Sequence, residues 1–179
     1  MISAILPTDG DPAALGPTLG ALTPGLMAGV LREVLFADAD GDPVVAAIAD
    51  ASGAEIVPGP RDHAARLSAA AAGAKGEWLL FLPVGPSLTP DWAEAARRHM
   101  IRRSDRAGWF RERARDGALA RLSGMGRNAW ALWIGLPRES HGLLIARELY
   151  LSVGATPGSA LIRRLGRGRL APLDAALTD

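Results

Sequence analysis

The sequence predicts one α/β domain over residues 1–179, built on a mainly parallel sheet with helices on both faces. Short apolar runs alternate with helical stretches through the first hundred residues, an order typical of a doubly wound sheet. The run at 78–82, Trp-Leu-Leu-Phe-Leu, is apolar on both faces and therefore belongs in the middle of a covered sheet. With 49% hydrophobic residues, the chain can bury a core without cross-links.

The first half of the chain divides into strands and helices at its turn residues. Apolar runs predict strands at 2–6, 32–37, 54–57 and 78–82, with helices between them at 13–22, 44–51 and 61–74. Gly73 and Gly76 mark the end of the last of these helices. Ligands of such sheets bind beyond the carboxyl ends of the strands. The segments where a site is expected are therefore 7–10, 38–42, 58–61 and 83–87.

The second half is less regular. Thr89 is a candidate cap for a helix from 90 to about 103, and a second helix is expected over 116–133, interrupted near 124–126. A strand is predicted at 142–146, followed by short helices at 147–153 and 159–165. No repeat or linker separates these elements from the first half.

Composition excludes several classes of protein. The chain has no cysteine, which excludes disulfides and thiolate metal sites. Its net charge of +1 argues against a dedicated nucleic-acid binder, despite an arginine-rich stretch at 97–115 whose expected role is a solvated helix face. No uncharged apolar run reaches the roughly 18 residues of a membrane span. These features predict a cytoplasmic protein, with peripheral contact to the inner face of the membrane as an open alternative.

Several segments together resemble family 2 glycosyltransferases, in particular a small bacterial subgroup. They are Ile-Ser-Ala-Ile-Leu-Pro-Thr at 2–8, Glu-Val-Leu-Phe-Ala-Asp at 33–38, Lys-Gly-Glu-Trp-Leu-Leu-Phe-Leu at 75–82, and Gly-Leu-Leu-Ile-Ala-Arg at 142–147. The resemblance implies a GT-A fold, a Rossmann-like nucleotide-diphospho-sugar domain. It also implies a nucleotide-binding half at 1–88 and an acceptor-side half at 89–179. The implied activity is transfer of a sugar from a nucleotide-diphosphate sugar to an unknown acceptor.

The resemblance also assigns site residues. Pro7, Thr8, Asp9 and Asp38 occupy the positions where the family binds its nucleotide. Candidate contacts to phosphate or acceptor are Arg61, Arg66 and His141. The plainer alternative is that Asp9 and Asp38 end strands and cap helices, as aspartate often does.

The sequence departs from the family where the family carries its acids. Metal-binding carboxylates normally follow the strand at 78–82, whereas this chain has Pro-Val-Gly-Pro at 83–86. The segment 154–160 lacks the acidic general base, and Ser140-His141 replaces an Asp-Gln pair. We therefore expect no metal site and no cofactor, and we leave the catalytic residues unassigned. The alternative to an active transferase is a degenerate, non-catalytic relative that binds a nucleotide or a protein partner.

Two other segments are similar to known functional motifs. Asp-Ala-Asp-Gly-Asp at 38–42 is similar to a phosphatase nucleophile motif and to a calcium loop, but Pro43 stands where the calcium loop needs glycine, and no Glu follows at its twelfth position. A solvated turn is the preferred interpretation. Gly-Met-Gly-Arg-Asn-Ala at 124–129 spells a dinucleotide fingerprint, but it follows a predicted helix, so the required strand-to-helix turn is absent.

Overall fold

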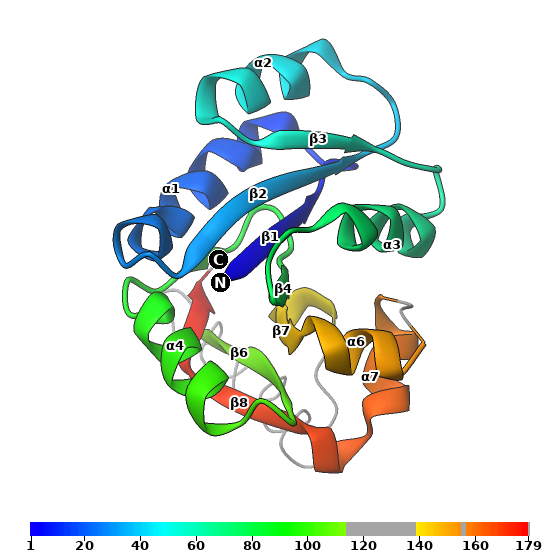
Figure 1. Cartoon of the computed structure of the whole chain (residues 1–179). Helices are drawn as coiled ribbons and strands as arrows, with labels where there is room; N and C mark the ends of the chain where they lie inside the picture. Colours follow the sequence, from blue (N-terminus) through cyan, green and yellow to red (C-terminus); the bar gives the residue numbers. More distant parts are fainter. Residues whose placement is uncertain (114–138, 155–156, 179) are drawn as a thin grey trace, which may run out of the picture.

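The computed structural model describes residues 1–113, 139–154 and 157–178, and these form a mostly parallel sheet between two layers of helices (Figure 1). The strand order in this part of the chain is β3-β2-β1-β4-β7-β6-β8-β5. The four strands expected in the first half all form and run parallel: β1 (Ile2–Pro7), β2 (Leu31–Asp38), β3 (Glu55–Pro58) and β4 (Trp78–Phe81). The predicted α/β sheet is therefore confirmed.

The other strands continue the same sheet beyond β4. The strand predicted at 142–146 forms as β7 (Leu143–Ala146). It pairs antiparallel with β4 and joins the two halves of the chain in one sheet. Three strands were not predicted: β5 (Ser87–Leu88), β6 (Ala107–Arg113) and β8 (Leu170–Thr178). Charged residues fall within β6, and Pro172 falls within β8, so neither segment has the signature of a strand. Pro172 lies opposite Trp109, directly beside a register shift that interrupts the β6–β8 ladder.

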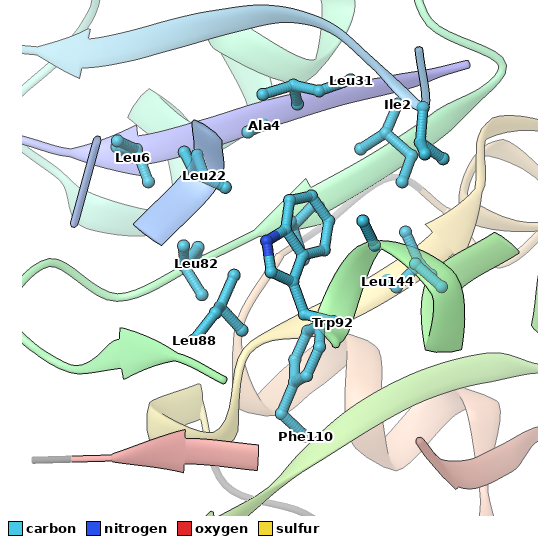
Figure 2. Close-up of a cluster of buried hydrophobic side chains, with 14 of the residues drawn as sticks. Ile2, Ala4, Leu6, Leu22, Leu31, Leu82, Leu88, Trp92, Phe110 and Leu144 are labelled. Carbon is cyan, nitrogen blue, oxygen red and sulfur yellow. The ribbon is translucent and has the colours of Figure 1, made fainter. Parts of the chain in front are cut away.

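Each face of the sheet has its own helices and its own core. One face carries α1 (Leu15–Met27), α2 (Pro43–Ser52) and α4 (Trp92–Arg102), and the other carries α3 (His63–Gly73), α6 (Arg147–Ser152) and α7 (Ser159–Leu165). Trp92 is the largest fully buried side chain of the first core (Figure 2). It is fully buried, and its indole N–H donates to the Ala21 carbonyl oxygen at 2.9 Å, so its one polar group is satisfied.

Aspartates begin the helices that leave the carboxyl edge of the sheet. Asp11 caps the short 3₁₀ turn Pro12–Ala14 ahead of α1, Asp42 caps α2, and Asp62 caps α3, each accepting a backbone N–H at 2.7–2.9 Å. The predicted cap at Thr89 is wrong. The hydroxyl of Thr89 instead accepts the Ala176 N–H at 3.1 Å and thereby ties β8 to the start of α4.

Some sequence predictions cannot be compared with the structure. The helix expected at 116–133 and the glycine motif at 124–129 lie outside the described residues. In the part that is described, no helix is both long enough and apolar enough to cross a bilayer.

Candidate functional site

The carboxyl ends of β1 and β2 bring Thr8 and Asp38 together. Backbone pairing continues past the end of β1, where the Thr8 N–H donates to Ala37 at 3.2 Å. The Thr8 hydroxyl donates to Oδ1 of Asp38 at 2.5 Å, and the Gly41 N–H donates to Oδ2 at 2.8 Å. Asp38 is only 6% exposed. Its orientation is therefore fixed by two neutral donors, one on each oxygen.

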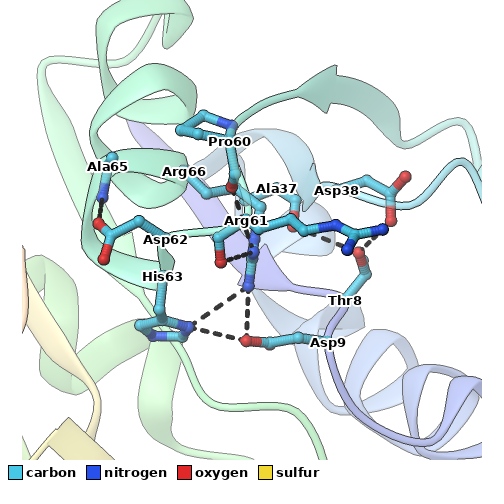
Figure 3. Close-up of polar contacts among 10 residues, drawn as sticks. All are labelled: Thr8, Asp9, Ala37, Asp38, Pro60, Arg61, Asp62, His63, Ala65 and Arg66. Carbon is cyan, nitrogen blue, oxygen red and sulfur yellow. Dashed lines mark hydrogen bonds and ion pairs between the residues drawn. The ribbon is translucent and has the colours of Figure 1, made fainter.

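A second carboxylate at this edge, that of Asp9, is held by Arg66 and His63 (Figure 3). Oδ2 of Asp9 accepts from Nη2 of Arg66 at 2.5 Å and lies 2.9 Å from Nδ1 of His63. Partial burial by itself raises the pKa of the Asp9 carboxyl. The His63 hydrogen bond and the charge of Arg66 outweigh that effect, so the pKa of Asp9 lies below its ordinary value of 3.8. Asp9 is thus an anion that is already partly neutralised.

Arg66 is the buried member of this group. Its side chain is 2% exposed, and Nη1 donates to the Arg61 carbonyl oxygen at 3.1 Å. Its Nε atom is buried without a hydrogen-bond partner among the described residues. Gly59 packs closely against this residue, because a Cβ at position 59 would lie 3.0 Å from Cγ of Arg66 and 3.2 Å from its Cα. Arg66, a predicted phosphate or acceptor contact, therefore lies at the same edge as the predicted nucleotide residues and bonds one of them, Asp9.

The other two predicted contacts lie in different surroundings. Arg61 is 90% exposed and reaches Asp40 at 3.4 Å, which leaves its guanidinium largely in solvent. His141 is fully buried, and its ring packs edge-on against Trp109 with ring centroids 5.4 Å apart. The structure thus places Arg61 on the surface of the carboxyl edge and His141 in the core.

A small apolar cavity of about 150 Å³ lies beside the Asp9 cluster. It extends from the ends of β1 and β4 toward α3, β7 and α7. Its lining is mostly aliphatic or aromatic, with His63 and Ser140 as polar members: Ile5, Pro7, His63, Leu67, Phe81, Leu82, Pro83, Ser140, Leu143, Gly158, Leu161 and Ile162. His63 therefore faces both the carboxylate of Asp9 and the cavity.

Sequence reasoning missed His63. Because ligands bind beyond the carboxyl ends of the strands, a site was expected at 58–61, a segment that ends two residues before His63. A signal was present, because His63 and Arg66 are three positions apart at the start of a helix and so share one face. Their common partner Asp9, however, is 54 residues away from His63, and only the folded chain shows that contact.

Comparison with known proteins identifies the fold. No family model matches the sequence, and no curated protein matches it. Among solved structures, glucosyl-3-phosphoglycerate synthase from Mycobacterium tuberculosis in complex with UDP aligns with a TM-score of 0.68 at 20% identity, over 96% of this chain and 69% of that chain. A structure described as a mycobacterial protein aligns at 0.70 and 19% identity, over 97% of this chain and 65% of that chain. The chain therefore has the GT-A fold of nucleotide-sugar transferases, which confirms that expectation.

The same comparison corrects the prediction that no metal takes part. The synthase was also solved with Mn²⁺, UDP and glucosyl-3-phosphoglycerate (TM-score 0.67, 19% identity, 96% of this chain and 68% of that chain). Another of its structures holds Mn²⁺ with UDP-glucose and phosphoglyceric acid. The prediction rested on the missing carboxylates after residues 78–82. Such carboxylates are not the only ligands available, because substrate phosphates supply much of the coordination of such cations.

Proposed function

We propose that this chain binds a nucleotide-diphosphate sugar at the carboxyl edge of β1 and β2 and transfers the sugar to an acceptor. The observation that supports this most strongly is the convergence of Thr8, Asp9 and Asp38 at one edge of a GT-A sheet. Ligands of open α/β sheets bind in this place. The solved synthase with the same fold was crystallised with UDP and UDP-glucose.

Each residue would act in a different way. Asp38 is held rigidly and keeps lone pairs for the N–H of a base or a ribose hydroxyl. Pro7 ends β1 and sets the direction of the turn that carries Thr8 and Asp9. Arg61 is exposed and weakly paired, so its guanidinium can turn toward diphosphate oxygens. Arg66 already neutralises Asp9, which would otherwise repel an approaching diphosphate.

Within 1–113, 139–154 and 157–178, no three His, Asp or Glu side chains are grouped closely enough to hold a cation. Substrate phosphates would therefore supply part of the coordination of a bound Mn²⁺. The turn after β4, residues 83–86, adds no carboxylate. The dependence of nucleotide binding on Mn²⁺ is therefore tested directly in the binding experiment.

A second candidate function is nucleotide binding without turnover. It is favoured by the missing acids after β4 and by the internal partners of both edge carboxylates. In that case the same residues would bind a nucleotide, and the acceptor side of the molecule would serve a protein partner.

Thermal unfolding with UDP, GDP, dTDP and CDP, each with and without Mn²⁺, tests the nucleotide site. A nucleotide at about 100 times its dissociation constant stabilises the folded state by roughly 2.7 kcal/mol, which raises Tm by several degrees. Asp38→Asn should abolish this shift, whereas Asp50→Asn, at an exposed position on α2, should retain it. If no nucleotide shifts Tm under either condition, the proposal is wrong.

Release of UDP from UDP-sugars then separates the two candidate functions. An active transferase or slow hydrolase turns over the bound donor, and Asp38→Asn should lose that activity. A protein that shows a selective nucleotide shift but no turnover with any donor and acceptor tried would be the non-catalytic relative.

A further inference from the structure

Exposed apolar and basic side chains lie at the edge of the sheet opposite the candidate site. The helix α1 ends where β2 begins, and α4 ends just before β6, so the C-terminal ends of both helices lie at the amino edge of the sheet. The two helices pack against each other on the same face (Figure 1). We call this region the amino-edge surface, and its members are Leu26, Met27, Arg97, Ile101, Arg102 and Arg103.

The apolar members are unusually exposed. The exposed fractions are 60% for Leu26, 84% for Met27 and 75% for Ile101. Ile101 and Ala28, the residue after Met27, line one groove of about 430 Å³ between the two helices. Leu26 and Met27 immediately precede Ala28 in the chain, so these exposed apolar side chains belong to the helix end that borders the groove. Exposed apolar side chains scattered singly are ordinary, but several at adjoining helix ends mark a surface that a partner can cover.

The basic members are Arg97 and Arg102 of α4 and its C-terminal cap residue Arg103. Arg97, Arg102 and Arg103 form no ion pair with any residue in the described ranges, whereas their neighbours Arg98 and Arg106 are paired with Glu94 and Asp105. Ala93, Arg97 and Ile101 recur every four residues along α4, which places a cation and a long apolar side chain on the stripe that faces the groove. Arg97 therefore shares the groove with Ile101, and Arg102 and Arg103 directly follow Ile101 in the chain.

We propose that the amino-edge surface docks the protein on an anionic lipid bilayer. Apolar side chains such as Met27 and Ile101 insert among acyl chains, and adjacent arginines extend toward lipid phosphates. Other occupants fit less well. Nucleic acid offers nothing to three exposed aliphatic side chains, and the net charge is only +1. A second copy related by two-fold symmetry would bring the same arginines against each other.

The proposal does not depend on the nucleotide site. Docking through the amino edge leaves the carboxyl edge, with Asp9 and Asp38, directed away from the bilayer. Nucleotide binding and vesicle binding should therefore be independent, so either proposal can fail while the other stands.

Co-sedimentation of the full chain with lipid vesicles provides the test. Binding is expected to phosphatidylcholine vesicles that contain phosphatidylglycerol, to be much weaker without it, and to weaken as salt screens the arginines. Replacing any one of Arg97, Arg102 or Arg103 by alanine should weaken binding about fivefold. Met27→Glu should weaken it by about tenfold or more, because it removes an inserted side chain and adds repulsion.

Matched controls separate docking from general effects of charge and folding. Leu151→Glu changes a side chain that is 59% exposed on α6, and Arg163→Ala removes an exposed arginine on α7; neither should reduce binding. All variants should keep the Tm of the parent, since the positions are exposed. Equal binding of Met27→Glu and Leu151→Glu would overturn the proposal. A dimer seen by light scattering that Met27→Glu dissociates, or salt-sensitive binding to an oligonucleotide without vesicle binding, would also overturn it.

Discussion

The two carboxylates at the carboxyl edge lie at the ends of neighbouring strands, Asp9 in the turn after β1 and Asp38 at the end of β2, but they are held in different ways. Asp38 is nearly buried and accepts from a hydroxyl and an amide, both neutral. Asp9 has a side chain that is 44% exposed, yet it bonds the nearly buried guanidinium of Arg66. The more exposed carboxylate should therefore contribute more to the free energy of unfolding, because its partner Arg66 is a charged group buried away from water.

Removing Asp9 should have the largest effect. Asp9→Ala leaves the Arg66 guanidinium buried without its counterion, and we expect a loss of about 3 kcal/mol in the free energy of unfolding. Urea denaturation measures this loss, with Asp50→Ala on the surface of α2 as the control. A loss no greater than that of the control would mean that Arg66 is satisfied by the carbonyl oxygens of Pro60 and Arg61 alone.

Removing Asp38 should cost less. Asp38→Ala leaves the Thr8 hydroxyl and the Gly41 N–H without this acceptor, which corresponds to about 2 kcal/mol for neutral groups. Because both original donors are neutral, the loss measured in urea should be the same at low and high salt. A salt-dependent loss would show that Asp38 has a charged partner after all.

The free energy of unfolding should depend on pH differently in the parent and in the Asp9→Asn variant, in which residue 9 is uncharged. The folded-state pKa of Asp9 is lowered, so its contribution to stability is present in full above the ordinary pKa of 3.8 and is lost as the pH falls through the lowered value. The difference in unfolding free energy between the parent and Asp9→Asn should therefore be constant at neutral pH and should narrow in acid. The pKa of Glu33 is also lowered, but Glu33 is present in both proteins, so its contribution cancels from the difference in unfolding free energy. A difference that widens in acid would contradict the assignment.

The exposed pair at the same edge should have the smallest effect. Arg61 and Asp40 are 3.4 Å apart, with side chains 90% and 65% exposed. Arg61→Ala should change stability by less than about 0.5 kcal/mol. If Arg61 contacts a diphosphate, as proposed, the same variant should weaken UDP binding by several-fold. Measuring both quantities separates a ligand contact from a structural one. A large loss of stability would show that Arg61 has a structural role like that of Asp9.

Sequence reasoning succeeded where the local signal and the tertiary arrangement agree. The strands β1, β2, β3 and β4 are short apolar runs between turn residues, so periodicity identified them, and the carboxyl-edge rule then placed Thr8, Asp9 and Asp38 together. It failed at β6 and β8. Each of these strands is stabilised by its partner in the ladder more than by its own composition, and Pro172 would ordinarily argue against a strand.

The sequence alone determined the α/β order, the absence of cysteine chemistry and the missing acids after β4, because these depend on residue identity and local periodicity. Only the tertiary structure decided which partner each edge carboxylate has. It brought His63 and Arg66 to Asp9 and gave Asp38 two neutral donors. It also left Met27 and Ile101 uncovered at the opposite edge. Contacts between residues tens of positions apart depend on how helices pack on the sheet, and no local pattern in the chain encodes them.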